Sequence, residues 1–326
     1  MTAPPIGYAC VLLLCLLHGR AFAQAADPQP PAPIRIGQFL LSGYIQYDYL
    51  TENRSSDDAQ FDVRRLRFQI SGPVTRGITF LVSAETTQTP VLRDGFITLD
   101  YLPAFTVSIG QMIMPYSYER YVASSNTLEF TERAVLDLSP SRDAGLMVEN
   151  TRPFFGWLSY GAAIANGTGQ NTPDNNDAKD AMLRLSVAPP TVSGLHVAVN
   201  AVRGDQPDGM RTRMGADVGF DRRGYRLVAE FLQDRTRDGA IRQDGFYAFG
   251  SWRIYPEAAR KGLDHLELAA RYGGLHGPVA NTRQWDVAAN YYVSRNCRFM
   301  LDFIVPDDPL PSGRGLVLHA RANVRF

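Results

Sequence analysis

Apolar and polar residues alternate in short stretches that recur along the chain from Phe39 to its last residue. Between Gln284 and Ser294, for example, apolar side chains take every second position. Such alternation places one set of side chains on each face of a β-sheet. Turn sequences such as Ser71-Gly72-Pro73 separate neighbouring stretches. The pattern predicts an all-β fold of about sixteen strands, including strands at 95–102, 105–112, 143–151, 157–166, 178–188, 194–202, 211–220, 225–234, 246–253 and 297–305.

The last predicted strand separates its two faces clearly, and the chain ends on the aromatic Phe326. Two-faced strands occur in soluble sandwiches, whose polar face meets water, and in membrane barrels, whose apolar face meets lipid and whose polar face lines a lumen. Three basic groups on one face favour the barrel, which also satisfies every backbone group without an edge. One face carries Leu316, Leu318, Ala320, Ala322, Val324 and Phe326, and the other carries Val317, His319, Arg321, Asn323 and Arg325.

The first residues are typical of a secreted protein. Residues 6–17 are apolar and Ala21-Phe22-Ala23 fits a small-x-small cleavage site, so we expect a signal peptide at 1–23. A Pro-rich periplasmic leader is expected at 24–36 and the barrel at 37–326. After cleavage only Cys297 remains, so no intrachain disulfide or cysteine metal cluster is possible. The remaining chain has no apolar run of transmembrane-helix length. Together these features predict a bacterial outer-membrane protein.

A long insertion at 113–142 interrupts the predicted strands. It exceeds the roughly 12–15 residues at which an unstructured loop becomes uncommon. It is rich in aromatic and charged residues, so it must fold against something, and we expect it to fold into the barrel as a constriction loop. Asn126, three residues before Glu129, predicts a helix start within it.

The formal net charge is zero, which argues against a nucleic-acid partner. Only Lys179 and Lys261 are lysines among the 33 basic residues. Biased codon usage is one explanation for this excess of arginine. The other is a surface that needs planar, permanently charged hydrogen-bond donors.

Six ordered segments resemble the phosphate-selective porin O and P family. They are 61–68 (FDVRRLRF), 92–101 (LRDGFITLDY), 109–116 (IGQMIMPY) followed by Glu119-Arg120, 130–133 (FTER), 141–145 (SRDAG), and 160–171 with its Asn-Gly. The resemblance is dense from about 62 to 185. It implies a sixteen-stranded trimeric anion porin, with loops folded into the lumen and arginines along its wall. Phosphate-selective members use lysines at the constriction, whereas the insertion here has none. The resemblance therefore supports anion passage and leaves phosphate selectivity open.

The residues expected along the anion pathway are all arginines. On the polar faces of predicted strands they form a ladder that can bind an anion and release it, and in the insertion they are expected to face the constriction. The alternative is a structural lattice of salt bridges with lumen acids such as Asp62, Glu85 and Asp100. The candidates are Arg65, Arg67, Arg321 and Arg325 on strands, and Arg120, Arg133 and Arg142 in the insertion.

The predicted function is passive diffusion of small anions, with phosphate and polyphosphate among the candidate solutes. Neither an HExxH nor a GxSxG motif is present, and we expect no catalytic, cofactor or metal site. Expected partners are small anionic solutes, outer-membrane lipid, two further copies in a homotrimer, and the barrel-assembly machinery through Phe326. The alternatives are a non-selective porin, a non-conducting structural or surface-binding barrel, and a secreted β-sandwich.

Overall fold

The computed structural model describes residues 33–52, 59–87, 89, 91–123, 128–134, 138–254, 265–294, 296–307 and 315–326. The signal peptide predicted at 1–23 lies outside these residues, as does most of the leader predicted at 24–36. Within the described ranges, no helix is both long enough and apolar enough to cross a membrane.

Most of the described structure is β-strand, as the alternation predicts. Two short helical segments, η2 (Tyr118–Val122) and η4 (Arg237–Gly239), lie between strands. The strands are β1 (Ile34–Ile36), β2 (Phe39–Glu52), β3 (Gln60–Thr75), β4 (Ile78–Glu85), β5 (Leu92–Leu99), β6 (Thr106–Ile113), β7 (Arg142–Glu149), β8 (Leu158–Ala165), β9 (Asp180–Val187), β10 (Leu195–Gln206), β11 (Gly209–Arg222), β12 (Tyr225–Thr236), β13 (Ile241–Ile254), β14 (His265–His276), β15 (Thr282–Ser294), β16 (Cys297–Pro306) and β17 (Val317–Arg325).

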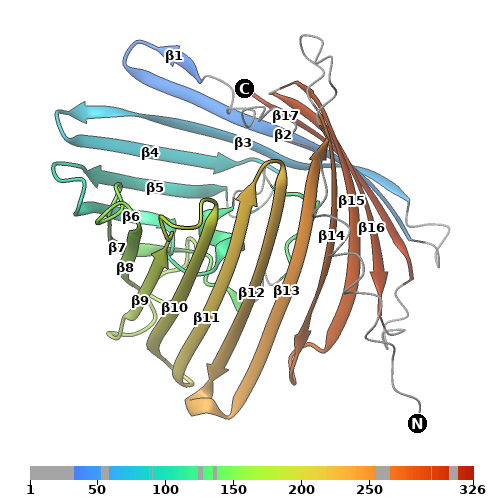
Figure 1. Cartoon of the computed structure of the whole chain (residues 1–326). Helices are drawn as coiled ribbons and strands as arrows, with labels where there is room; N and C mark the ends of the chain where they lie inside the picture. The colour runs from blue at the N-terminus through green and yellow to red at the C-terminus, as the bar shows by residue number, and fades with distance from the viewer. Residues whose placement is uncertain are drawn as a thin grey trace.

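The strands from β2 to β17 close into a barrel of sixteen strands, which confirms the predicted fold. Each pairs antiparallel with its neighbours in the chain, and β17 pairs back onto β2 from Val317↔Glu52 to Arg325↔Tyr44. Figure 1 shows this closure, with the red β17 beside the blue β2. The short β1 pairs only with the first residues of β2 and adds no wall strand among those described.

The barrel has its apolar side outward. On β15, Trp285 and Val287 are each 48% exposed, whereas Asp286 between them and Asn290 further along the strand are buried. Aromatic pairs such as Trp252 with Tyr225 stack on the sheet. A soluble protein has the opposite arrangement, and apolar-out with polar-in is the pattern of a barrel surrounded by lipid.

The seam between β17 and β2 depends on Gly43. Its amide donates to the carbonyl of Phe326 at 2.9 Å, and the amide of Phe326 donates back at 3.0 Å. A Cβ on Gly43 would lie 2.3 Å from the carbonyl oxygen of Arg67 and 2.5 Å from the Phe326 ring. The ring of Phe326 also packs on Phe68, with centroids 5.9 Å apart. Any side chain at position 43 therefore pushes apart the strands that close the barrel.

We expect Gly43→Ala to reduce the yield of closed barrel, because the methyl group meets backbone and an aromatic ring. The penalty for such overpacking is about 1–3 kcal/mol. The measurement is the fraction of refolded protein that resists denaturation in unheated SDS electrophoresis. Gly95→Ala is the matched control, since the nearest atoms to its Cβ belong to Leu92 at 3.7 and 3.8 Å. Equal yields from the two variants would contradict this role for the seam.

Candidate functional site

The insertion between β6 and β7 lies against inward-facing groups of the opposite wall. The hydroxyl of Tyr116 donates to the carbonyl of Met214 on β11 at 3.0 Å. The amide of Tyr118 donates to Glu230 on β12 at 2.8 Å. Further along, Asn290 on β15 donates to the carbonyl of Glu129 at 2.8 Å. The described parts of the insertion therefore cross the interior of the barrel.

The helix predicted to start at Asn126 is not borne out in the residues that follow it. Asn126 lies outside the described residues, and 128–134 contain bends and no helix. The amide and hydroxyl of Thr131 both donate to Asp302 of β16, and the amide of Ala134 donates to Glu119. Carboxylates thus satisfy these amides instead of the carbonyls of a helix. The helical turn in the described insertion comes earlier, as the π-helical η2.

One face of the insertion is apolar and fills part of the barrel interior. Met114, Tyr116 and Phe130 are almost fully buried and belong to one cluster with Leu232 of β12 and Tyr247 of β13. The ring of Phe130 also packs edge-on against Phe249, with centroids 5.7 Å apart. This packing gives the insertion a fixed position rather than leaving it free in the lumen.

Arg271 of β14 is the most connected attachment point of the insertion. Its guanidinium pairs with Asp286 at 2.7 Å and with Glu119 at 3.2 Å, and donates to the carbonyl of Glu132 at 2.9 Å. It also lies 4.3 Å above the ring of Phe130. One buried side chain therefore holds three separate positions of the insertion.

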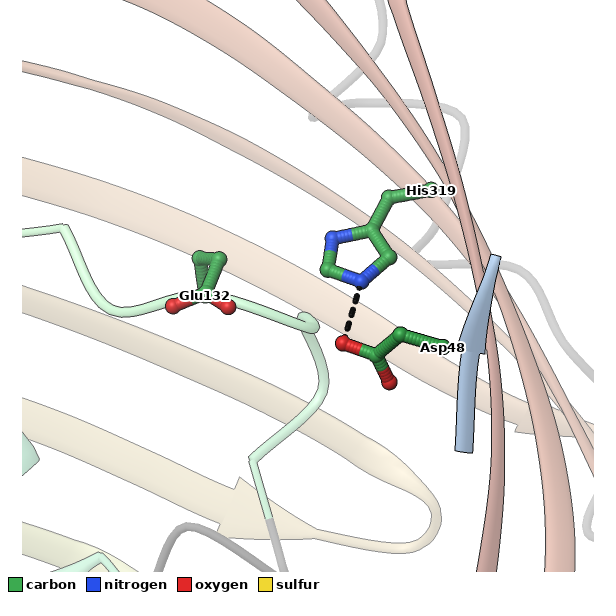
Figure 2. Close-up of side chains that lie close together, drawn as sticks. All are labelled: Asp48, Glu132 and His319. Atoms are coloured by element: carbon green, nitrogen blue, oxygen red, sulfur yellow. Dashed lines mark hydrogen bonds and ion pairs between the residues drawn. The ribbon is translucent and has the colours of Figure 1, made fainter. Parts of the chain in front are cut away.

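A second attachment point contains Asp48, Glu132 and His319, whose possible ligand atoms lie within 4.8 Å of one another. Figure 2 shows the imidazole of His319 directed at Asp48, with Nε2 2.7 Å from the carboxylate. Its Nδ1 lies 2.9 Å from the hydroxyl of Thr131. Arg321 pairs with Asp48 through two atoms at 2.7 Å and reaches Glu132 at 3.4 Å. Because both ring nitrogens are bonded and a guanidinium occupies the carboxylates, these residues fit a loop attachment and do not fit a metal ion.

Several of the predicted arginines have partners on the wall, as the salt-bridge alternative proposed. Arg67 lies 3.3 Å from Glu85, and Arg142 makes two bonds to Asp94 at 2.7 and 3.1 Å. Arg65 donates to Gln46 at 2.8 Å. Together with Arg321, these side chains face the interior, but each also has a structural partner.

The other two insertion arginines belong to a group of like charges. Arg133 donates to the carbonyl of Ala123 at 3.3 Å. Burial, together with the positive charges of Arg133, Arg142 and Arg93, lowers the pKa of Arg120 to about 9. Burial also lowers the pKa of Arg133. Guanidiniums from the insertion, β5 and β7 therefore converge on one region of the interior.

A cavity of about 600 Å³ remains between the insertion and the inner faces of β2 to β7. It extends from Arg142 at the start of β7 to Arg325 near the end of the chain. Arg67 lies between these two positions and also lines it. Three of the seven predicted arginines thus share one cavity.

Two arginines that strand alternation did not select also point inward because of β-bulges. In the β2–β3 register Gln46 pairs with Arg65 and Tyr47 with Val63, which leaves Arg64 as an extra residue. In the β4–β5 register Arg93 is the extra residue in the same way. A bulge turns the side chain of its extra residue to a new direction. Arg64 reaches Glu132 of the insertion at 3.3 Å.

The sequence profile of the phosphate-selective porin O and P family matches residues 38–219, more than half of the 326 residues. A search of curated proteins finds no match. Among solved structures, OmpF of Salmonella typhi in complex with daunomycin has a TM-score of 0.63 at 13% identity, over 88% of this chain and 97% of that one.

Two further porins show the same fold. An anion-selective porin from Comamonas acidovorans has a TM-score of 0.60 at 12% identity, over 88% of this chain and 98% of that one. The trimer form of OmpT from Vibrio cholerae has a TM-score of 0.60 at 10% identity, over 88% and 99%. At these identities the likeness concerns the fold alone.

Proposed function

The chain belongs to the phosphate-selective porin O and P family, and we propose that it lets small anions diffuse passively through the barrel. Its family and fold are those of a channel of the bacterial outer membrane. The observation that carries the anion preference is the interior cavity lined by Arg67, Arg142 and Arg325, with the charges of Arg93, Arg120 and Arg133 near Arg142. Phosphate is one candidate solute, because guanidiniums bind oxyanions through paired hydrogen bonds.

The pairing of the insertion's carboxylates with arginines supports a preference for anions over cations. Glu119 is held by Arg271 at 3.2 Å, and Glu129 by Arg226 at 2.6 Å. Glu132 lies between Arg64 and Arg321. Each carboxylate of the described insertion is therefore neutralised by an arginine of the wall. The positive charges of Arg120 and Arg133 lie near those of Arg93 and Arg142, and together they bias the adjacent lumen toward anions.

The insertion has two roles in this proposal. It narrows the lumen, because its apolar face packs on β12 and β13 and leaves the cavity on the side of β2 to β7. It also carries Arg120 and Arg133 into the interior, near Arg142, which lines that cavity. The arginines along this cavity bind anions strongly enough for them to enter. The wall carboxylates next to Arg67 and Arg142 weaken this binding, so that the anions can also leave.

The decisive test is planar-bilayer recording of the refolded mature protein in a KCl gradient. We expect discrete current steps and a reversal potential that favours chloride. A potential that favours potassium would overturn the assignment of the arginines. An absence of current from correctly folded protein would favour the non-conducting barrel, in which the insertion blocks the lumen.

The contribution of wall charge is testable through the pair formed by Arg67 and Glu85. We expect Arg67→Gln to lower the chloride-to-potassium permeability ratio, because one positive charge is removed from the cavity wall. The double variant Arg67→Gln/Glu85→Gln removes the pair without changing net charge, and we expect it to restore most of the ratio. Reversal potentials in the same gradient measure both. Equal ratios for the two variants would show that net charge at this position does not set selectivity.

We also propose that three copies assemble, after removal of residues 1–23 and insertion through the assembly machinery that reads Phe326. OmpT, which shares the fold, is known in a trimer form. Light scattering in mild detergent measures the mass, and a monomer at every protein concentration would contradict the proposal.

A further inference from the structure

The lining of the cavity is unusual for a path taken by hydrated inorganic ions. Interiors of outer-membrane barrels are generally polar. Here Phe96 of β5, Met112 of β6 and Met147 of β7 face inward and line the same cavity as Arg67 and Arg142. The lining therefore combines guanidiniums with aromatic and thioether side chains.

The apolar cluster explains only part of this lining. Met112 and Met147 are 2% and 6% exposed and pack with the apolar face of the insertion, and Phe96 packs against the same cluster. The cluster needs apolar side chains where the insertion touches the wall. It does not require that they also line the cavity, which all three do, the partly buried Phe96 together with small exposed patches of the two methionines. The cavity therefore has an apolar wall in addition to its charged one.

The two walls differ in what they can offer a solute. Arg67 has five N–H donors, and one of them bonds Glu85 at 3.3 Å. Because Arg67 lines the cavity, it offers further donors to a solute there. Phe96, Met112 and Met147 offer no hydrogen bond and cannot replace the hydration of an ion. They do form favourable contacts with aromatic rings, since thioether sulfur packs well against a ring edge.

We propose that the cavity is a binding site for aromatic carboxylates, with the carboxylate at Arg67 and Arg142 and the ring against Phe96, Met112 and Met147. This inference rests on the proposed function and names a solute class for it. The volume of about 600 Å³ lies within the range of roughly 300–1,000 Å³ typical of small-molecule sites. An inorganic oxyanion in the same position leaves part of its surface against apolar groups, whereas an aromatic carboxylate matches both walls.

The test compares four anions as blockers of the chloride current through the wild-type channel: benzoate, cyclohexanecarboxylate, acetate and inorganic phosphate. We expect benzoate to halve the current at a concentration at least about tenfold below that of acetate or phosphate. Cyclohexanecarboxylate is expected to fall between them, because it keeps the apolar body and loses the aromatic ring. Equal block by benzoate and acetate overturns the inference, and so does block by phosphate at lower concentration than benzoate.

A matched pair of variants separates solute contact from damage to the apolar cluster. Met112→Gln and Met182→Gln make the same change in the same cluster, but only Met112 lines the cavity. We expect Met112→Gln to raise the half-blocking concentration of benzoate about tenfold, each variant being normalised to its own chloride current, and Met182→Gln to leave it near the wild-type value. Equal shifts in both variants overturn the assignment of the apolar wall.

The same recordings distinguish failure of this inference from failure of the proposed function. A chloride-selective channel that does not discriminate among the four anions refutes only the aromatic carboxylate site. A potassium-selective channel, or folded protein without current, refutes the anion channel itself. If Met112→Gln does not fold, the four-anion comparison on the wild-type protein still decides the question.

Discussion

Arg271→Met is expected to destabilise the folded barrel by about 3–5 kcal/mol, the usual penalty for removing one partner of a buried ion pair. Arg271 is 2% exposed, and its loss leaves the buried carboxylates of Asp286 and Glu119 without their cation. It also removes the bond to the carbonyl of Glu132 and the contact with the ring of Phe130. The insertion is therefore expected to detach from this part of the wall.

Two measurements follow this change separately. Urea or guanidinium unfolding in detergent reports the loss of stability. Single-channel recording reports whether the insertion keeps its position in the lumen. We expect a larger mean conductance with more current noise, because a detached insertion no longer holds one position across the lumen.

Arg184→Met is the matched control for Arg271→Met. Arg184 is also buried and inward-facing, and it pairs with Asp217 at 2.7 Å and bonds to Asn200, both on wall strands. We expect a comparable loss of stability from this variant without the rise in current noise. If both variants give the same single-channel behaviour, the conductance change comes from general loosening of the barrel rather than from release of the insertion.

Arg120→Gln/Arg133→Gln is expected to have the largest effect on ion selectivity. At the dielectric constant of water, one unit charge about 4 Å from an ion is worth about 1 kcal/mol, or about a fivefold change in relative occupancy. The carboxylates of the described insertion are paired with wall arginines, and this variant leaves those pairs in place. It therefore removes two positive charges from the interior without removing a negative one. We expect the chloride-to-potassium permeability ratio to fall by about fivefold or more.

The reversal potential in a KCl gradient measures this ratio, and the effect is expected to weaken at high salt because ions screen the remaining charges. Arg120→Lys/Arg133→Lys is the charge-conserving control. It is expected to keep the chloride preference and to change the binding of oxyanions, since lysine lacks the planar pair of donors. An unchanged ratio in the glutamine variant would show that the charges governing selectivity lie elsewhere on the wall.

The sequence by itself determined the barrel and the faces of its strands. Alternation on the last strand placed His319, Arg321 and Arg325 on one face, and in the structure that face lines the interior. The reason is geometric: successive side chains of a strand point to opposite sides, so the pattern reports the two environments directly. The insertion at 113–142 was also visible, because no strand pattern spans it.

Only the tertiary structure decided which arginines meet, what holds them, and where the insertion attaches. The bulges at Arg64 and Arg93 break the alternation, and their positions depend on pairing with β2 and β4. The helix predicted from Asn126 gave way to amides bound by Asp302 and Glu119, residues that the linear pattern does not connect with them. Arg271 carried no sequence signal beyond its polar face, since its role depends on groups more than a hundred residues away. Alternation records which side a residue faces, whereas contacts across the lumen depend on barrel closure, which no local pattern encodes.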